Sequence, residues 1–302
     1  MKAYDIEVSE LVLAPEQQGG QGWCYGLPPG IGPEEWPLDP WSGYPMMHGF
    51  TILLPEEYRI HGSEIAALSF FATSPDHNDG SHVQGYEGTR SVIEIPGDAP
   101  PGDPQLRPFW ERACMAHPRT HRMYDILDCA YAVILLTREE FDAGPCMPPP
   151  AVDSSLVGMV PPPLWLSKGA FNSSDFFTAS PASSGEEVGD RHVHRPLTWT
   201  ARANDPNAGM PPRDYYGEEP EEGGYRPFFY WLDGKTEIEN WREHEWADGH
   251  AANHIGGTMR PAQNTPDFSP YYIEFEEDFG GYNFGGGNAQ LDFRDMKFDF
   301  AC

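Results

Sequence analysis

The chain has 302 residues, of which 39% are hydrophobic and 13% aromatic, a composition typical of a folded domain and not of a disordered chain. Its 47 acidic residues outnumber 19 basic ones, which leaves a formal net charge of −28 at pH 7. Such a charge disfavours binding to nucleic acid and to anionic membranes, and it favours a cationic partner.

Glycine and proline, with 32 residues each, divide the chain into short segments. Because proline cannot continue a helix and glycine weakens one, we expect a β-rich α+β fold with few helices and long loops. The five cysteines are odd in number and form no CxxC pair, which favours reduced thiols. With no secretory signal and no membrane-length apolar run, the sequence predicts a cytoplasmic protein.

Short apolar segments predict the strands. The first is expected near the N-terminus, where apolar and acidic residues alternate, and a central strand is expected in the segment that contains AALSFF. The predicted strands are residues 4–8, 50–54, 65–72 and 89–95, and one within 124–137.

The clearest predicted helix begins at Thr236, because Thr236 and Glu239 fit a capping box. It should end near Gly249, since glycine is typical of the position after a helix. From His254 onward the chain is rich in glycine and aromatic residues, and we expect further strands there.

Prolines concentrate in residues 144–163, a stiff segment that we interpret as a hinge. It would separate an N-terminal sheet lobe, residues 1–143, from a C-terminal lobe, residues 164–302. The C-terminal lobe would carry a long polar, irregular insertion before residue 224. One continuous domain is the alternative.

The sequence also contains a weak internal similarity. Residues 50–71 and 272–293 share the order of strand, acidic turn, glycine and strand, and each follows a loop rich in glycine and proline. This order predicts two related antiparallel sheet units in one chain. Coincidence between glycine-rich strands is the alternative.

These segments resemble the YwqG-like family. The stretches GLPPGIGPEEWPL, GYPMMHGFTILL and ALSFF within residues 26–71 are similar to its N-terminal half, and HIGGTMRPAQ, YYIEF and GGNAQLDF within residues 254–293 to its C-terminal half. The resemblance implies a β-rich α+β fold with internal similarity. Some members are immunity proteins of secreted bacterial toxins, including type VI toxins, and the resemblance extends that expectation to this chain.

Two acidic clusters are the candidate binding sites for a partner. In the first, carboxylates stand beside tyrosines, which can supply anchor area while the carboxylates pair with Arg or Lys. Glu274 stands close to the second cluster. Solvated loops are the alternative for both. The residues predicted to bind the partner are Tyr215, Tyr216, Glu218, Glu219, Glu221, Glu222, Glu276, Glu277 and Asp278.

Motifs for catalysis or metal binding are weak. His244, His250 and His254 lie close in sequence, but their spacing fits no known zinc motif. We therefore predict no catalytic residue, no metal and no cofactor. The alternative function is an enzyme, a hydrolase of unknown substrate, with a site near His254 and Gln263.

Charge and resemblance together predict an immunity protein that binds and neutralises a cationic antibacterial toxin, with a type VI nuclease effector as one candidate. A nuclease groove is basic because it binds a polyanion, so an acidic protein can occupy it and associate rapidly. A scaffold protein without a toxin partner is a third reading.

Overall fold

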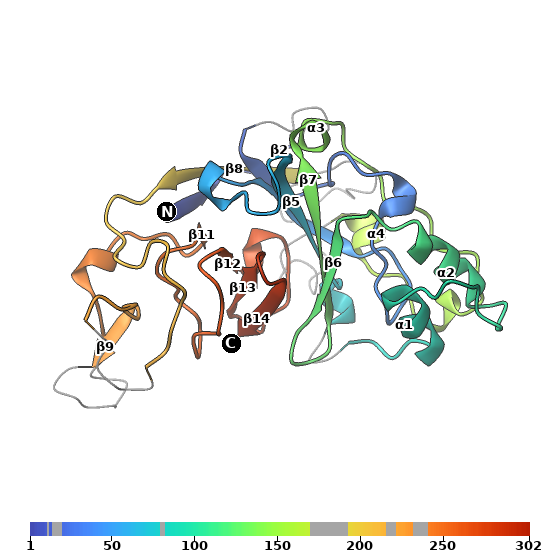
Figure 1. Ribbon diagram of the computed structural model, residues 1–302. Helices are drawn as coiled ribbons and strands as arrows, with labels where there is room; N and C mark the ends of the chain where they lie inside the picture. The colour runs from blue at the N-terminus through green and yellow to red at the C-terminus, as the bar shows by residue number, and fades with distance from the viewer. Residues whose placement is uncertain (11, 14–19, 79–81, 170–192, 216–221, 232–240) are drawn as a thin grey trace. The chain divides into compact units, whose positions relative to one another are not determined.

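The computed structural model describes residues 1–302 apart from 11, 14–19, 79–81, 170–192, 216–221 and 232–240 (Figure 1). Strands predominate over helices in the described residues, which confirms the predicted β-rich class. Among these residues no helix is long and apolar enough to cross a membrane. All five cysteines are free thiols.

The chain forms two compact units, and each is assembled from segments that are distant in sequence. The larger unit consists of Val8–Leu197 and Asp278–Asn283. The smaller unit consists of Met1–Glu7, Thr198–Glu277 and Phe284–Cys302. Their boundaries differ from the two lobes and the hinge expected from the sequence, because both ends of the chain contribute strands to the smaller unit.

The larger unit is built on an antiparallel sheet with the strand order β8-β3-β4-β5-β7-β6, and β2 pairs with β8. The side chains of β4 and β5 are buried along their whole length, and both strands are largely apolar. Phe70 stacks against Phe50 and Tyr131 on the neighbouring strands. The strands are β2 (Val12–Leu13), β3 (Gly22–Tyr25), β4 (Met47–Leu53), β5 (Ile65–Ala72), β6 (Thr120–Tyr124), β7 (Ala130–Thr137) and the first five residues of β8 (Val193–Ala201).

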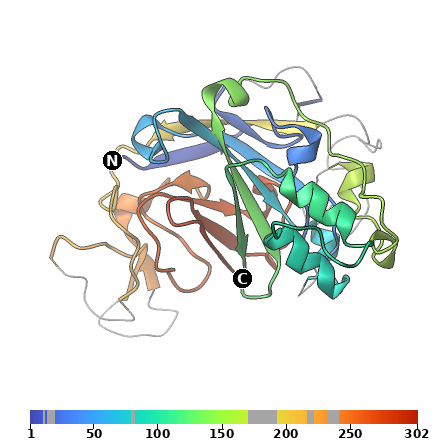
Figure 2. The ribbon, with the colours of Figure 1, turned by 45° about the vertical axis from the view of Figure 1, so that its right-hand side comes forward.

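Helices α1 and α2 lie beside each other in the larger unit, as both views show (Figures 1 and 2). They share a hydrophobic cluster that contains Ile93, Phe109 and Tyr44. The α-helices described in this unit are α1 (Glu87–Glu94), α2 (Arg107–Cys114), α3 (Arg138–Phe141) and α4 (Trp165–Lys168).

The proline-rich segment 144–163 packs within the larger unit. The Tyr44 hydroxyl contacts the carbonyl oxygens of Val157 and Val160, both at 3.2 Å. Val157 and Val160 are buried in the same cluster as Phe109. This segment therefore contributes side chains to the core of the larger unit.

The smaller unit is built on an antiparallel sheet in the order β14-β13-β12-β11-β1. Successive side chains on a strand point to opposite faces, so one face of β12 carries Ile273 and Phe275 while the other carries Tyr272 and Glu274. A separate hairpin pairs β9 with β10. The strands are β1 (Tyr4–Val8, of which Val8 belongs to the larger unit), β9 (Phe229–Trp231), β10 (Trp241–Glu243), β11 (His254–Ile255), β12 (Tyr272–Glu276), β13 (Asn288–Asp292) and β14 (Lys297–Ala301).

Several predicted strands are confirmed. Residues 4–8 and 65–72 form β1 and β5 with the expected bounds, and 50–54 lies largely within β4. The segment 124–137 holds β7 after a turn, and strands β11 to β14 follow from His254. The predicted irregular region is wrong at residues 193–201, which form β8.

The strand predicted at 89–95 is wrong, because these residues form most of helix α1. A strand would have placed Ile93 and Ile95 on one face. In the structure Ile93 is 2% exposed and Ile95 is 80% exposed, while Thr89 and Ile93 are both buried at helical spacing. A segment this short fits both periods, and packing against α2 selects the helix.

The helix predicted from Thr236 to Gly249 is also wrong where the structure describes it. Residues 232–240 lie outside the described residues. Trp241–Glu243 forms strand β10, paired with β9, and a 3-10 turn follows at Glu245–Ala247. Helix propensity is a local tendency, and pairing with β9 makes Trp241–Glu243 a strand.

Replacement of Gly30 with alanine should destabilise the larger unit. Gly30 has a φ of +66°, and a Cβ there would collide with the backbone of Glu140. We expect the free energy of unfolding to fall by about 2 kcal/mol or more, measured by urea denaturation. Gly158→Ala is the matched control, because a Cβ at Gly158 meets nothing within 4 Å. Equal stability of the two variants would contradict the prediction.

Candidate functional site

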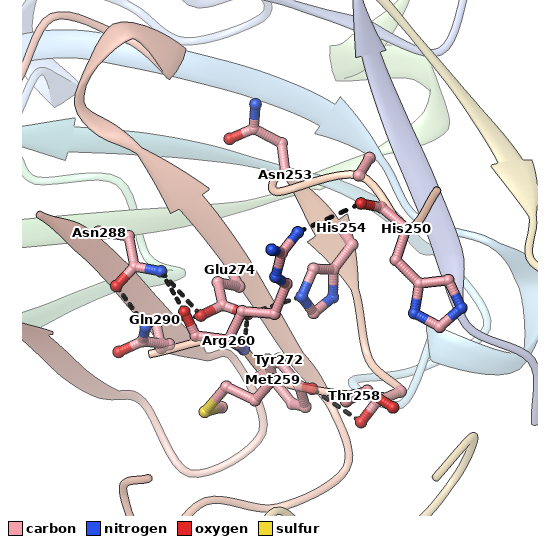
Figure 3. Close-up of polar contacts among 12 residues, drawn as sticks. His250, Asn253, His254, Thr258, Met259, Arg260, Tyr272, Glu274, Asn288 and Gln290 are labelled. Carbon is pink, nitrogen blue, oxygen red and sulfur yellow. Dashed lines mark hydrogen bonds and ion pairs between the residues drawn. The ribbon is translucent and has the colours of Figure 1, made fainter. Parts of the chain in front are cut away.

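A row of polar side chains crosses the sheet of the smaller unit. The strand register places His254 opposite Glu274, and Glu274 opposite Gln290, so these three side chains share one face. His254 and Glu274 are fully buried, and Gln290 is 1% exposed. Figure 3 shows their polar groups turned toward one another across β11, β12 and β13.

The carboxylate of Glu274 is the centre of this row. Its Oε1 accepts hydrogen bonds from Asn288 Nδ2 at 3.0 Å and from Gln290 Nε2 at 2.9 Å. Its Oε2 accepts one from the backbone N–H of Arg260 at 2.7 Å and faces His254 Nε2 at 2.6 Å. The two oxygens of a carboxylate have about four hydrogen-bonding sites, so these four contacts occupy all of the sites that the Glu274 side chain offers.

The imidazole of His254 is held on both sides. Its Nδ1 lies 2.9 Å from the carbonyl oxygen of Gly256, which can only accept, so Nδ1 carries a hydrogen. Its Nε2 faces the Glu274 side chain at 2.6 Å, so one hydrogen is shared in this contact. The arrangement is a histidine–glutamate pair inside the fold. Such a pair organises the structure, because both side chains are enclosed and their hydrogen-bonding sites are occupied.

The glycines after His254 are required by this geometry. Gly256 and Gly257 have φ values of +60° and +84°, which side chains with a Cβ rarely adopt. A Cβ at Gly257 would also collide with Asp205 and Ala3. The Gly257 carbonyl accepts the Tyr272 hydroxyl at 2.9 Å. The paired glycines thus turn the chain back over the polar row.

A second buried network joins the irregular segment after β8 to this turn. Asp205 accepts hydrogen bonds from the Thr258 hydroxyl at 2.8 Å and from Arg202 Nη1 at 2.9 Å. Arg202 also donates to Asp5 on β1 at 2.6 Å, and only 1% of the Arg202 side chain is exposed. Burial by itself would raise the pKa of Asp205, but the hydrogen bonds from Thr258 and Arg202 hold the pKa below its usual value.

The two residues of the alternative enzyme hypothesis have different surroundings. His254 is sealed within the fold, and Glu274 and Gly256 hold it there. Gln263 is exposed and donates to the carbonyl oxygen of Cys302 at 2.6 Å. General acid–base catalysis requires a histidine within hydrogen-bond reach of its substrate, and an enclosed imidazole offers no such reach.

The histidines near β10 pack on an aromatic ring. His244 stacks on Trp246 with ring centroids 5.0 Å apart, and His250 lies 6.0 Å from the same ring. Burial lowers the pKa of both histidines. Within the described part of the chain, no group of three or more His, Cys, Asp or Glu side chains could hold a metal ion.

Part of the second acidic cluster faces outward. Glu276 and Asp278 are exposed, whereas Glu277 is half-buried and its carboxylate accepts the backbone N–H groups of Phe284 and Gly286. Glu277 therefore fixes the turn after β12. Of this predicted set, Glu276 and Asp278 present their carboxylates at the surface.

Most of the first acidic cluster lies outside the described residues, namely Tyr216, Glu218, Glu219 and Glu221. Of its described members, Glu222 is exposed, and Tyr215 is buried with Arg213 placed 4.9 Å from its ring centroid. Tyr215 thus packs within the smaller unit and offers little surface to a partner.

Sequence reasoning counted Glu274 only among neighbouring carboxylates and did not single out Arg202, Asp205 or Asn288. The alternation of apolar and polar residues in 271–275 and 288–292 was the available indication that one face of the sheet is polar. The alternation did not show that the polar side chains on this face are buried. Compared with models of protein families, with curated proteins and with solved structures, the chain matches none.

Replacing Glu274 with glutamine should strongly destabilise the smaller unit. The amide NH2 of glutamine would face the backbone N–H of Arg260, which is also a donor, and His254 would lose its carboxylate partner in the interior. We expect a loss of about 3 kcal/mol or more in the free energy of unfolding, measured by urea denaturation. Glu276→Gln is the matched control, since Glu276 lies two residues along the same face and is exposed. A similar loss of stability in both variants would show that Glu274 is not the centre of the buried polar row.

Asp205 should contribute to the pH dependence of stability. A carboxyl group whose pKa is lower in the folded chain stabilises the fold above its unfolded pKa, about 3.9, and loses that contribution as pH falls through the folded value. Asp205→Asn should therefore be less stable than the wild type near neutral pH, and the difference should shrink on acidification below about pH 4. Urea unfolding across this range checks it, with exposed Asp248→Asn as the control. A difference independent of pH would contradict the prediction.

Proposed function

We propose that this protein is a cytoplasmic immunity protein that binds a cationic antibacterial toxin and blocks its functional groove. The proposal rests first on how the carboxylates are distributed. Glu274 and Asp205 are consumed by internal hydrogen bonds, whereas Glu222, Glu276 and Asp278 are exposed in a chain whose formal net charge is −28. The internal groups hold the fold, and the exposed ones lie on the surface that a basic partner would contact.

The proposed mechanism is electrostatic capture. A surplus of surface carboxylates attracts a basic protein over distances comparable with the Debye length, about 8 Å at physiological salt. Such steering raises the association rate more than it slows dissociation. A toxin that acts on nucleic acid is the partner class that fits best, because its substrate groove must be positively charged.

We also infer that the two sheets are related and that the chain is a member of the YwqG-like family. The segments with similar sequence order both form an antiparallel strand pair around a 3-10 turn. The turn at Glu56–Tyr58 lies between β4 and β5 along the chain, and the turn at Glu277–Phe279 lies between β12 and β13. This shared order supports the inference, and a family-level resemblance supplies its context.

Co-expression tests the proposal. The product of the neighbouring gene should be toxic when expressed alone in bacteria, and this protein should restore growth. The purified pair should associate with a rate constant that falls by about tenfold or more as salt rises from low to physiological concentration, because screening weakens steering. A harmless neighbouring product, or a toxic one that this protein does not neutralise, would refute the proposal.

A further inference from the structure

Two large aliphatic side chains stand at the tip of the β6–β7 hairpin. Ile126 is 87% exposed and Leu127 is 37% exposed. Ile95, at the end of α1, is 80% exposed. Single exposed apolar residues are ordinary on protein surfaces, but three at neighbouring elements form a feature that often marks an interaction site.

The tip is held by its own hydrogen bonds. The Oδ1 atom of Asp125 accepts the backbone N–H groups of Leu127 at 2.8 Å and Cys129 at 2.9 Å, and its Oδ2 accepts the Tyr131 hydroxyl at 2.9 Å. Asp128 closes the turn with a φ of +63°, and its backbone N–H donates to the Asp125 carbonyl at 3.0 Å. These contacts fix the backbone that carries Ile126 and Leu127.

Helix α1 is joined to the same hairpin. Arg90 forms ion pairs with Glu94 and, at 2.6 Å, with Asp128. Its guanidinium lies 4.2 Å from the centre of the Trp41 ring, and the Trp41 indole donates to the Asp128 carbonyl at 2.8 Å.

The Tyr124 hydroxyl completes the connection, because it donates to Glu94 at 2.6 Å. Glu94 immediately precedes Ile95, and Tyr124 lies two residues before Ile126. Figure 2 shows α1 beside the hairpin, so Ile95 at the end of the helix and the two residues at the hairpin tip lie on neighbouring elements that these contacts join.

We call this the α1–hairpin surface and define it by Ile95, Ile126 and Leu127. Its apolar side chains are presented on a backbone that is already ordered. Binding a partner there would therefore cost this chain less conformational entropy than binding through a loose loop that must first become ordered. Aliphatic anchors on a rigid support are a common arrangement at the centre of protein interfaces.

The charge around this surface indicates the kind of partner. Residues 90–98 and 124–128 contain four carboxylates, Glu94, Asp98, Asp125 and Asp128, against one cation, Arg90, so the net charge is 1 − 4 = −3. A second copy of the chain would bring an equally acidic rim and a net charge of −28, and the two would repel. An apolar segment flanked by Lys or Arg is complementary to both the anchors and the rim.

We propose that the α1–hairpin surface docks a basic protein partner through an apolar segment flanked by lysine or arginine. This inference rests on the proposed function only for the biological identity of the partner. The surface itself can be tested with a defined probe.

The probe is a synthetic amphipathic peptide of leucine and lysine, and binding to the full chain is measured by fluorescence anisotropy. Two matched peptides replace its leucines with serine or its lysines with glutamate. The protein variant carries Ile126→Ser and Leu127→Ser. Met159→Ser is the control, because Met159 is 61% exposed and is not one of the three residues that define the surface.

We expect the double variant to bind the leucine–lysine peptide about tenfold or more weakly than the wild type, and Met159→Ser to bind it as the wild type does. Both matched peptides should bind weakly. Because the substituted side chains are exposed, the urea midpoints of all variants should be unchanged, which separates lost binding from lost folding.

Equal weakening in the double variant and in Met159→Ser would overturn the proposal. So would binding of the serine–lysine or the leucine–glutamate peptide as tight as that of the leucine–lysine peptide. Sedimentation that reveals a dimer dissolved by the double substitution would also overturn it, by making a second copy the occupant. If the peptide results hold while co-expression fails, the docking surface stands and the immunity function falls. If co-expression succeeds while the peptide results fail, the docking proposal falls and the toxin binds another face.

Discussion

Glu274 lies on the central strand of the smaller unit, and its two oxygens receive contacts from β11, β13 and the backbone of Arg260. A charged group inside a fold is costly unless its hydrogen-bonding sites are occupied. The four contacts meet that condition together, so each depends on the position of the others. The strand register and the paired glycines after His254 are arranged around this requirement.

This constraint also separates structural from functional chemistry. A histidine beside a glutamate is the combination from which hydrolases build acid–base catalysts, yet here both partners are enclosed. The groups that face solvent are different ones: carboxylates such as Glu276 and Asp278, and the aliphatic side chains of the α1–hairpin surface. In this structure carboxylates and aliphatic side chains face solvent, while the histidine–glutamate pair joins the strands of the smaller unit.

Local patterns predicted most of the strands, because the apolar or alternating residues of a short segment indicate a strand without reference to the rest of the chain. Residues 65–72 are apolar along their whole length and form β5, and 4–8 alternate and form β1. The failures occurred where local patterns were ambiguous. Residues 89–95 fit both a strand and a helix, and α2 decided between them. The capping box at Thr236 precedes Trp241–Glu243, and pairing with β9 made that segment a strand.

The sequence by itself determined that this protein is β-rich, acidic and divided into short elements. These properties depend on residue counts or on patterns within a few neighbouring residues. Tertiary structure alone decided which carboxylates are buried and hydrogen-bonded and which are exposed to solvent. Glu274, Glu276 and Glu277 are nearly adjacent in sequence, yet one anchors the core, one faces solvent and one closes a turn. Their roles depend on partners such as Asn288 and His254, which the fold brings together from distant parts of the chain.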